Sequence, residues 1–209
     1  MINLSPIVTG PFQVNCYVAW DASGQALIFD PGEDPGRILE FLTQHRLEVS
    51  AYICTHGHAD HICALAALHA QHPAPVAMHG LDWDWAFDAR FHRLAPYYPL
   101  PEKPATAEYL PLEQGNELTW GGFHLQCIET PGHTPGSCCL LFPEAGMLIS
   151  GDTLFRGSCG RTDLPGGSPG QMRESLNKLK QLPDAIRVFP GHGPETTIGI
   201  ERSSNPYMQ

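Results

Sequence analysis

This sequence has no cluster of positive charge and no long apolar run. Its 209 residues contain 12 Lys and Arg against 22 Asp and Glu, a formal net charge of -10 at pH 7. Because phosphate backbones are bound by clustered cations, we expect no nucleic acid partner. No stretch is apolar over the thickness of a bilayer, so we also expect no membrane partner. With 42% hydrophobic and 16% charged residues, the composition is that of an ordinary globular protein.

Paired cysteines are missing as well. The seven cysteines are an odd number, Cys138 and Cys139 are adjacent, and no spacing forms a CxxC motif. A disulfide framework and a zinc finger are therefore excluded, and we expect reduced, mostly buried thiols. Residues 1–6 lack the basic start and apolar stretch of a signal peptide, so the expected location is cytoplasmic.

What the sequence does contain is a dense group of potential metal ligands at residues 55–61, Thr-His-Gly-His-Ala-Asp-His. An apolar strand is expected just before it at 51–54, and a helical period of apolar residues follows at 62–69. The segment therefore lies on a loop between a strand and a helix, where polar side chains can converge. Neutral imidazole and carboxylate groups suit zinc, manganese or iron. We interpret the segment as a metal site.

The number of candidate ligands favours two metals. His56 and His58 face the same way on an extended loop, whereas Asp60 and His61, at the helix start, can serve a second site. Three more candidates stand beside glycine at predicted strand ends, namely His133, Asp152 and His192. Seven ligands exceed the three protein groups that one catalytic metal uses. Two metals about 3.5–4 Å apart, bridged by Asp152, would use all seven and indicate hydrolysis.

The apolar patterns predict two sheets covered by helices, in a chain long enough for one large domain. Strands are predicted at 12–20, 26–30, 51–54, 75–78, 117–119, 123–129, 137–142, 147–150 and 186–189. Helices are predicted at 36–45, 62–69, 81–92 and 170–182. Residues 95–104, dense in proline and tyrosine, predict an irregular loop.

The ordered set His-x-His-x-Asp-His, Gly-His, Gly-Asp-Thr and Gly-His resembles the metallo-β-lactamase superfamily over nearly the whole chain. This resemblance implies an α/β fold, an αββα sandwich of two mixed β-sheets flanked by helices, with a dinuclear site at one edge. By position, it implies a first metal at His56, His58 and His133, and a second at Asp60, His61 and His192, with Asp152 bridging. Asp60 and Asp152 would be the catalytic carboxylates. Asp30 matches a structural acidic position of the superfamily or is a turn residue at a strand end.

Within the superfamily, Gly-Asp-Thr-Leu-Phe at 151–155 and Cys-Gly-Arg at 159–161 are similar to glyoxalase II. The tail, at 191–197 and 201–206, resembles the short glyoxalase II-like proteins of the YcbL type. This implies a metal-dependent thioester hydrolase that converts S-lactoylglutathione and water to D-lactate and glutathione, in methylglyoxal detoxification. Hydroxide bound to two divalent ions, zinc by preference and otherwise iron or manganese, would attack the carbonyl.

The same resemblance implies that residues 1–209 form a single domain without the C-terminal helical domain that binds glutathione in longer enzymes. Arg161 would bind the glutathione part of the substrate, or would form an exposed surface ion pair. Asp163 and Pro194 stand where tyrosines of the glutathione pocket are expected.

Several alternatives stay open from sequence. Residues 159–163 also resemble persulfide dioxygenases, which use one iron and molecular oxygen, although 191–194 lack the Ala-His-Asp-Tyr run of those enzymes. A hydrolase of the same fold could act on another ester or lactone. β-Lactam hydrolysis is disfavoured because such enzymes are exported. Cys159 is a candidate nucleophile or a packed thiol, and the aromatic residues of 83–98 form a lid over the substrate or, by preference, ordinary packing.

Overall fold

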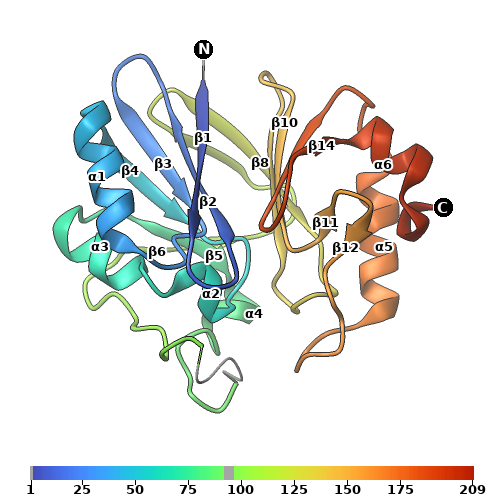
Figure 1. The fold of residues 1–209 in the computed structure, drawn as a ribbon, viewed down its shortest axis with the longest axis horizontal. Helices are drawn as coiled ribbons and strands as arrows, with labels where there is room; N and C mark the ends of the chain where they lie inside the picture. The colour runs from blue at the N-terminus through green and yellow to red at the C-terminus, as the bar shows by residue number, and fades with distance from the viewer. Residues whose placement is uncertain (1, 92–96) are drawn as a thin grey trace.

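The first sheet is built from the N-terminal half of the chain in the computed structural model, which describes residues 2–91 and 97–209 (Figure 1). The strands follow chain order: β1 (Asn3–Thr9), β2 (Val14–Trp20), β3 (Gln25–Phe29), β4 (Glu48–Ile53), β5 (Val76–His79) and β6 (Tyr109–Leu112). β1, β2 and β3 pair antiparallel, and the pairs from β3 to β6 are parallel. The sheet is therefore mixed.

The second sheet is built from the C-terminal half. Its strands, in spatial order, are β14 (Thr196–Thr197), β13 (Arg187–Pro190), β10 (Met147–Gly151), β9 (Cys138–Phe142), β8 (Phe123–Glu129) and β7 (Glu117–Trp120). Only the β10–β13 pair is parallel. A separate two-stranded hairpin follows β10, formed by β11 (Leu154–Phe155) and β12 (Ser158–Cys159).

Helices cover the outer faces of both sheets. The N-terminal helices are α1 (Pro35–His45), α2 (Ala59–Ile62), α3 (Leu65–Gln71) and α4 (Gly80–Trp83). The C-terminal helices are α5 (Pro169–Leu179), α6 (Ile198–Ser204) and the 3₁₀ helix η1 (Pro206–Met208). The result is an αββα sandwich of two mixed sheets (Figure 1), which confirms the predicted fold class. None of the helices in the described ranges is long and apolar enough to cross a membrane.

Alternation along the strands divides the core into three layers. On β3, Ile28 packs towards α1 and α3, whereas Leu27 and Phe29 pack between the two sheets. A third cluster lies between the second sheet and α5, where Leu176 and Leu179 are buried. Because successive side chains point to opposite faces, strands with two buried faces read as continuous apolar runs.

Two strands escaped prediction because each contains a proline. Pro6 lies in β1 and Pro111 in β6, the two outer strands of the first sheet. An edge strand tolerates proline because one side of its backbone needs no hydrogen-bond partner in the sheet. The short segments β11, β12, β14 and α6 were not predicted either.

The helix predicted at 81–92 was wrong over most of its length. Only α4 is helical there, and residues 84–91 form turns, while His92 lies outside the described residues. Asp88 accepts a hydrogen bond from the backbone N–H of Arg90, at 2.9 Å, and so competes with helical pairing. Of the helix predicted at 62–69, residues from Leu65 on belong to α3, whereas Ile62 ends α2 and residues 63 and 64 form a turn. Residues 97–104 are irregular as predicted, and 95 and 96 are not described.

Candidate metal centre

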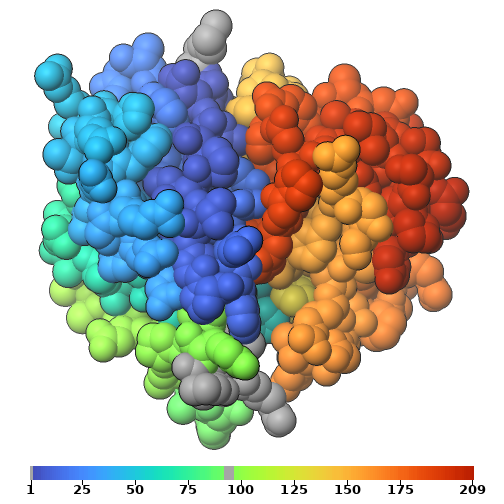
Figure 2. Space-filling view, viewed as in Figure 1, coloured from blue at the N-terminus to red at the C-terminus, as the bar shows by residue number. Residues whose placement is uncertain are grey.

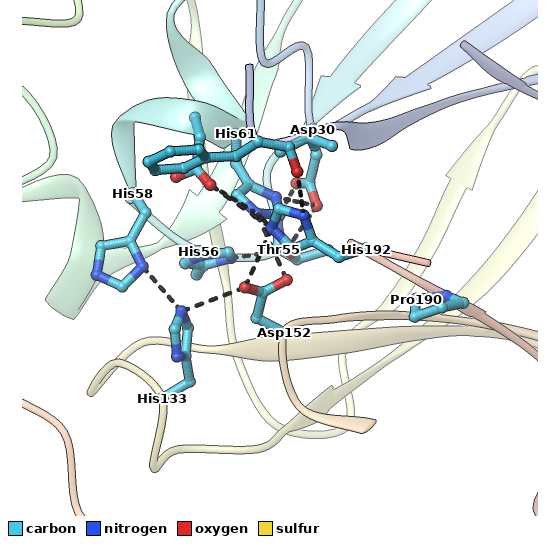
Figure 3. A network of polar contacts seen from close by, with 12 residues as sticks. Asp30, Thr55, His56, His58, His61, His133, Asp152, Pro190 and His192 are labelled. Carbon is cyan, nitrogen blue, oxygen red and sulfur yellow. Dashed lines mark hydrogen bonds and ion pairs between the residues drawn. The ribbon is translucent and has the colours of Figure 1, made fainter. Parts of the chain in front are cut away.

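The seven candidate ligands meet beyond the carboxyl ends of four strands. Figure 3 shows the group and labels all of them except Asp60. They are His56 and His58 in the loop after β4, Asp60 and His61 on α2, His133 after β8, Asp152 after β10, and His192 after β13. The structure thus brings together residues that are up to 136 positions apart, from His56 to His192. Their ligand roles stay a prediction that the following geometry supports.

His56, His58 and His133 form the first group, with ligand atoms within 4.8 Å of one another. His58 Nδ1 lies 2.8 Å from His133 Nε2, so the two nitrogens either share a proton or face a common cation. His133 Nδ1 donates to the carbonyl of Arg161 at 2.8 Å, which leaves Nε2 as an acceptor. Burial, then the neighbouring histidines, hold the pKa of His56 well below its usual value. Its neutral form is the one that binds metals.

Asp60, His61 and His192 form the second group. His192 Nε2 lies 3.5 Å from Asp60 Oδ2 and 3.3 Å from His61 Nε2, while its Nδ1 donates to the carbonyl of Phe12 at 3.0 Å. Burial acts to lower the pKa of His61, but the carboxylates of Asp152 and Asp60 outweigh it and raise the pKa to about 10. The negative charge at this position therefore attracts a proton or a cation.

Asp152 lies between the two groups. Its Oδ1 is 3.4 Å from His61 Nε2, and its Oδ2 is 3.5 Å from His133 Nε2 and 3.6 Å from His192 Nε2. Glycine at 191 makes this approach possible, because a Cβ there would lie 2.3 Å from Asp152 Oδ1. One carboxylate thus reaches histidines of both groups, as a bridging ligand would.

Unpaired polar atoms test whether these residues suit a metal. Among the buried side-chain nitrogens and oxygens of the described ranges, three have no hydrogen-bond partner, and two of them are His56 Nε2 and Asp152 Oδ1. A buried lone pair without a partner is costly, and a cation at the centre would satisfy both. The donor set has no thiolate, so it suits zinc, iron and manganese alike.

Asp30 orients the centre. Its Oδ1 accepts from the backbone N–H of Thr55 at 2.7 Å, and its Oδ2 accepts from Thr55 Oγ1 at 2.7 Å and lies 3.1 Å from His61 Nδ1. With both oxygens occupied, this carboxylate holds His61 so that Nε2 points to Asp60 and Asp152. An outer carboxylate of this kind fixes the tautomer of a metal-binding histidine.

Asp82 on α4 has a role that the sequence did not reveal. Its side chain is fully buried, and its Oδ2 accepts from Gly57 N at 2.8 Å and Thr134 Oγ1 at 2.6 Å, while Oδ1 accepts from Gly136 N at 2.7 Å. Burial raises the pKa of Asp82, and these hydrogen bonds oppose the rise. The carboxylate joins the loop of His56 and His58 to the loop of His133. Within a predicted helix, no local signal distinguishes it from a surface aspartate.

The C-terminal helix α6 holds the β11–β12 hairpin. Glu201 is fully buried and accepts from Gly157 N at 2.7 Å, Thr196 Oγ1 at 2.6 Å and Asn205 Nδ2 at 2.8 Å. Asn205 Nδ2 also donates to the carbonyl of Ser158, at 2.9 Å. The residues of 201–206, noted in the sequence only as a family-like tail, thus fix a hairpin beside the metal centre.

A cavity of about 520 Å³, the metal cavity, opens beside the ligands where the N-terminal half meets the C-terminal half (Figure 2). Its walls include Phe12, Phe155, Ser158, Cys159, Arg161 and Leu164. The Arg161 guanidinium donates to both oxygens of Asp163, at 2.7 and 2.8 Å, and both side chains are exposed. The surface ion pair that the sequence left open is therefore present, while substrate binding by Arg161 stays a prediction.

The described aromatic residues of 83–98 mostly pack against neighbouring side chains, and Trp85 contacts a candidate ligand. Trp83 stacks on Tyr109 with ring centroids 4.3 Å apart, and Tyr98 is buried and accepts from Phe12 N. The ring centroids of Trp85 and His58 lie 5.7 Å apart, and Tyr97 is exposed.

Half-burial raises the pKa of the Cys159 thiol, which makes the thiolate scarcer than in an exposed cysteine.

Comparison with known proteins places this arrangement in a family. The family model described as the metallo-beta-lactamase superfamily matches residues 9–192. The probable metallo-hydrolase YqgX of Bacillus subtilis is 38% identical over 200 residues, which are 95% of this chain and 94% of YqgX. The hydroxyacylglutathione hydrolase GloC of Haemophilus influenzae is 34% identical over 212 residues, 99% of this chain and 98% of GloC.

Solved structures agree with this result. The BLEG-1 B3 metallo-beta-lactamase superposes with a TM-score of 0.92 at 37% identity, over 99% of this chain and 100% of that chain. TTHA1623 in a di-iron-bound form has a TM-score of 0.83 at 38% identity, over 97% of this chain and 99% of that chain. ETHE1 from Myxococcus xanthus has a TM-score of 0.80 at 28% identity, over 98% of this chain and 83% of that chain.

Proposed function

The chain belongs to the metallo-β-lactamase superfamily, and from this premise we propose that it is a metal-dependent thioester hydrolase of the glyoxalase II kind. Its substrate would be S-lactoylglutathione or a related glutathione thioester, cleaved to the hydroxy acid and glutathione. The observation that carries the hydrolase proposal is Asp152, whose carboxylate reaches both ligand groups. The similarity to GloC supports the choice of thioester.

In this proposal all seven candidates act as ligands. His56, His58 and His133 would hold one divalent ion, Asp60, His61 and His192 the other, and Asp152 both. When bound, two such ions lower the pKa of water and polarise a carbonyl oxygen. Zinc is the preferred metal in this proposal, and the di-iron-bound form of TTHA1623 supports iron as the alternative.

The chain's own residues would position water and substrate. Asp60 and Asp152 line the metal cavity, where a carboxylate oxygen can orient a water molecule and take its proton. The water oxygen bonds to the thioester carbonyl carbon, the C–S bond breaks, and the thiol leaves with a proton. Phe12, Phe155 and Leu164 give the cavity apolar walls. The raised pKa of Cys159 argues against an acylated cysteine.

A turnover screen with metal analysis tests this proposal. The purified protein should hydrolyse S-lactoylglutathione and carry close to two transition-metal ions per chain. Arg161→Ala should lower kcat/KM about 10–100-fold, because charge-assisted hydrogen bonds contribute about 1.5–3 kcal/mol. A thioester without the glutathione carboxylates should be affected far less. Arg90→Ala, which removes an exposed arginine that is likewise paired with an aspartate two positions away, Asp88, is the matched control.

Equal losses by Arg161→Ala on both thioesters would assign Arg161 to the structure of its loop. Absence of any thioester turnover by the metal-loaded protein would refute the hydrolase as proposed. Oxygen consumption with glutathione persulfide, without thioester cleavage, would move the protein to the dioxygenase class.

A second candidate is β-lactam hydrolysis. The observation that favours it is the superposition on BLEG-1 B3 metallo-beta-lactamase over 99% of the chain. The same seven ligands can serve this reaction, because it also adds water to a carbonyl carbon. Including a chromogenic cephalosporin in the screen separates the two. Turnover of the cephalosporin above that of every thioester would favour the β-lactamase.

A further inference from the structure

A second cavity, of about 600 Å³, lies beside the metal cavity. We call it the α5 cavity, because its walls are residues 159–162, one face of α5 and the C-terminal residues 206–209. Met172 and Leu176 are buried beneath it, whereas Arg173 and Asn177 on its rim are exposed. Apolar side chains combined with polar groups of this kind are found at small-molecule sites.

The two cavities share part of their walls. Cys159 and Arg161 line both of them, with the metal ligands on one side and α5 on the other. The Arg161 side chain is exposed, so a molecule that reacts at the metal centre would reach the face of α5 by passing over this side chain. The α5 cavity is then in position to hold the part of a substrate that leaves.

Two arginines line this cavity in a chain whose net charge is -10. Arg161 and Arg173 both line it. Arg161 is paired with Asp163, but an exposed ion pair is weak, so a ligand anion can replace the aspartate at little cost. Across residues 2–91 and 97–209, Arg173 has no carboxylate within ion-pair distance. One exchangeable guanidinium and one uncommitted guanidinium therefore face the cavity.

We propose that the α5 cavity binds the thiol part of the substrate, an anionic thiol whose methylene chain lies on Met172 and Leu176 and whose terminal anion binds Arg173. This inference rests on the proposed thioester hydrolysis and adds the side of the substrate from which the thiol departs. The anion is a carboxylate, as in a peptide thiol such as glutathione, or a phosphate, as in a phosphopantetheine-type thiol. A guanidinium recognises either group through two parallel hydrogen bonds.

Arg173→Ala tests the site in two ways. For thioesters of an anionic thiol, KM should rise about 10-fold with little change in kcat, because a uniform binding contact is lost. The thioester of the uncharged thiol N-acetylcysteamine should be unaffected. Comparing acyl-glutathione with acyl-coenzyme A distinguishes carboxylate from phosphate. Arg37→Ala, which removes an equal exposed charge on α1, is the control.

Calorimetry with S-hexylglutathione, which cannot be hydrolysed, gives a readout independent of turnover. We expect Arg173→Ala to bind it about 10-fold more weakly than the wild type or Arg37→Ala. Unchanged binding and unchanged KM in Arg173→Ala would overturn the α5 cavity as the thiol site. If no thioester is hydrolysed but binding still depends on Arg173, the hydrolase proposal fails while the anionic-thiol site stands.

Discussion

Three histidine side chains of the candidate metal centre are oriented through their outer nitrogens. His133 donates to the carbonyl of Arg161, His192 donates to the carbonyl of Phe12, and His61 faces Asp30. Each contact leaves Nε2 directed at the centre, so the tautomer is fixed by the surrounding protein. Such partners adjust metal affinity although they do not touch the metal.

Asp82 provides the first prediction at this scale. In Asp82→Asn, the amide N–H₂ would face the N–H donor of Gly57 or Gly136, so a hydrogen bond is replaced by a clash of donors. Metal affinity of the His56–His58–His133 group should fall about 10–100-fold, the range for residues outside the ligand shell. The metal-free protein should lose about 1–3 kcal/mol of unfolding free energy. Competition with a chromogenic chelator measures the affinity.

Asp84→Asn is the control for Asp82→Asn, because Asp84 is exposed and lies two residues further along the same segment. Asp84→Asn should leave both the metal affinity and the unfolding free energy unchanged. If Asp82→Asn binds metal as tightly as the wild type and loses only stability, Asp82 supports the fold and does not position the ligands.

His124 gives a prediction for pH. His124 Nδ1 lies 2.9 Å from Glu144 Oε1, and His124 Nε2 lies 3.3 Å from Glu117 Oε2. Hydrogen bonds with these two carboxylates raise the pKa of His124 above the ordinary value of 6.5. Since the folded pKa is the higher one, the stabilisation is complete below the unfolded pKa and is lost as pH rises through the folded pKa. Glu144→Gln should lower the pKa of His124 in an NMR titration. A titration that is identical in both proteins would contradict the contact.

Between secondary structure elements, the clearest dependence is that of the β11–β12 hairpin on α6. Phe155, Ser158 and Cys159 of the hairpin line the metal cavity, and Glu201 and Asn205 hold its backbone. The hairpin has only two residues in each strand, and a two-stranded hairpin is marginal in water by itself. Its position therefore depends on the C-terminal helix.

Glu201→Ala should release this hairpin. It would leave Gly157 N–H and Asn205 Nδ2 without their shared acceptor, at a cost of about 1–3 kcal/mol in unfolding free energy. Hydrogen exchange of the Gly157 amide should become faster, and KM for the substrate should rise because the cavity wall moves. Glu195→Ala, in an exposed pair with Arg187, should change neither. Unchanged exchange at Gly157 would rule out the clamp.

At the scale of the whole molecule, the centre joins the two halves of the sandwich. His56, His58, Asp60 and His61 come from the half with the first sheet, and His133, Asp152 and His192 from the half with the second. Direct contacts reinforce the junction: Asn15 Nδ2 donates to the carbonyl of Pro190 at 2.9 Å, and so does the Tyr17 hydroxyl at 2.9 Å. A bound metal would therefore link the halves.

Metal removal should lower the melting temperature. A ligand present at 1,000 times its Kd stabilises the folded state by about 4 kcal/mol. For a chain of this size, that corresponds to a shift of about 8–16 °C, which calorimetry with and without a chelator measures. Zinc should restore the loss, whereas calcium, which prefers all-oxygen sites, should not. Equal melting temperatures with and without metal would contradict a metal centre that links the halves.

The amino-acid sequence by itself determined the candidate ligands and the architecture. The histidines and aspartates at 56–61 form a local cluster, and His133, Asp152 and His192 each follow an apolar strand beside glycine. Alternation and helical period located most strands and helices, because burial of one face leaves a repeat in the sequence. These patterns missed β1 and β6, which contain Pro6 and Pro111. Proline is acceptable in these two strands only because they lie at the edges of the sheet.

Only the tertiary structure decided which polar residues serve the centre without touching a metal. Asp82 reaches Gly136 across 54 positions, and Glu201 reaches Gly157 across 44. No periodicity records such contacts, because a buried carboxylate and the backbone donors that satisfy it need not be near in sequence. The α5 cavity arises in the same way, since its walls come from a loop, a helix and the end of the chain. Local patterns record which face of an element is buried, and folding determines which distant groups meet there.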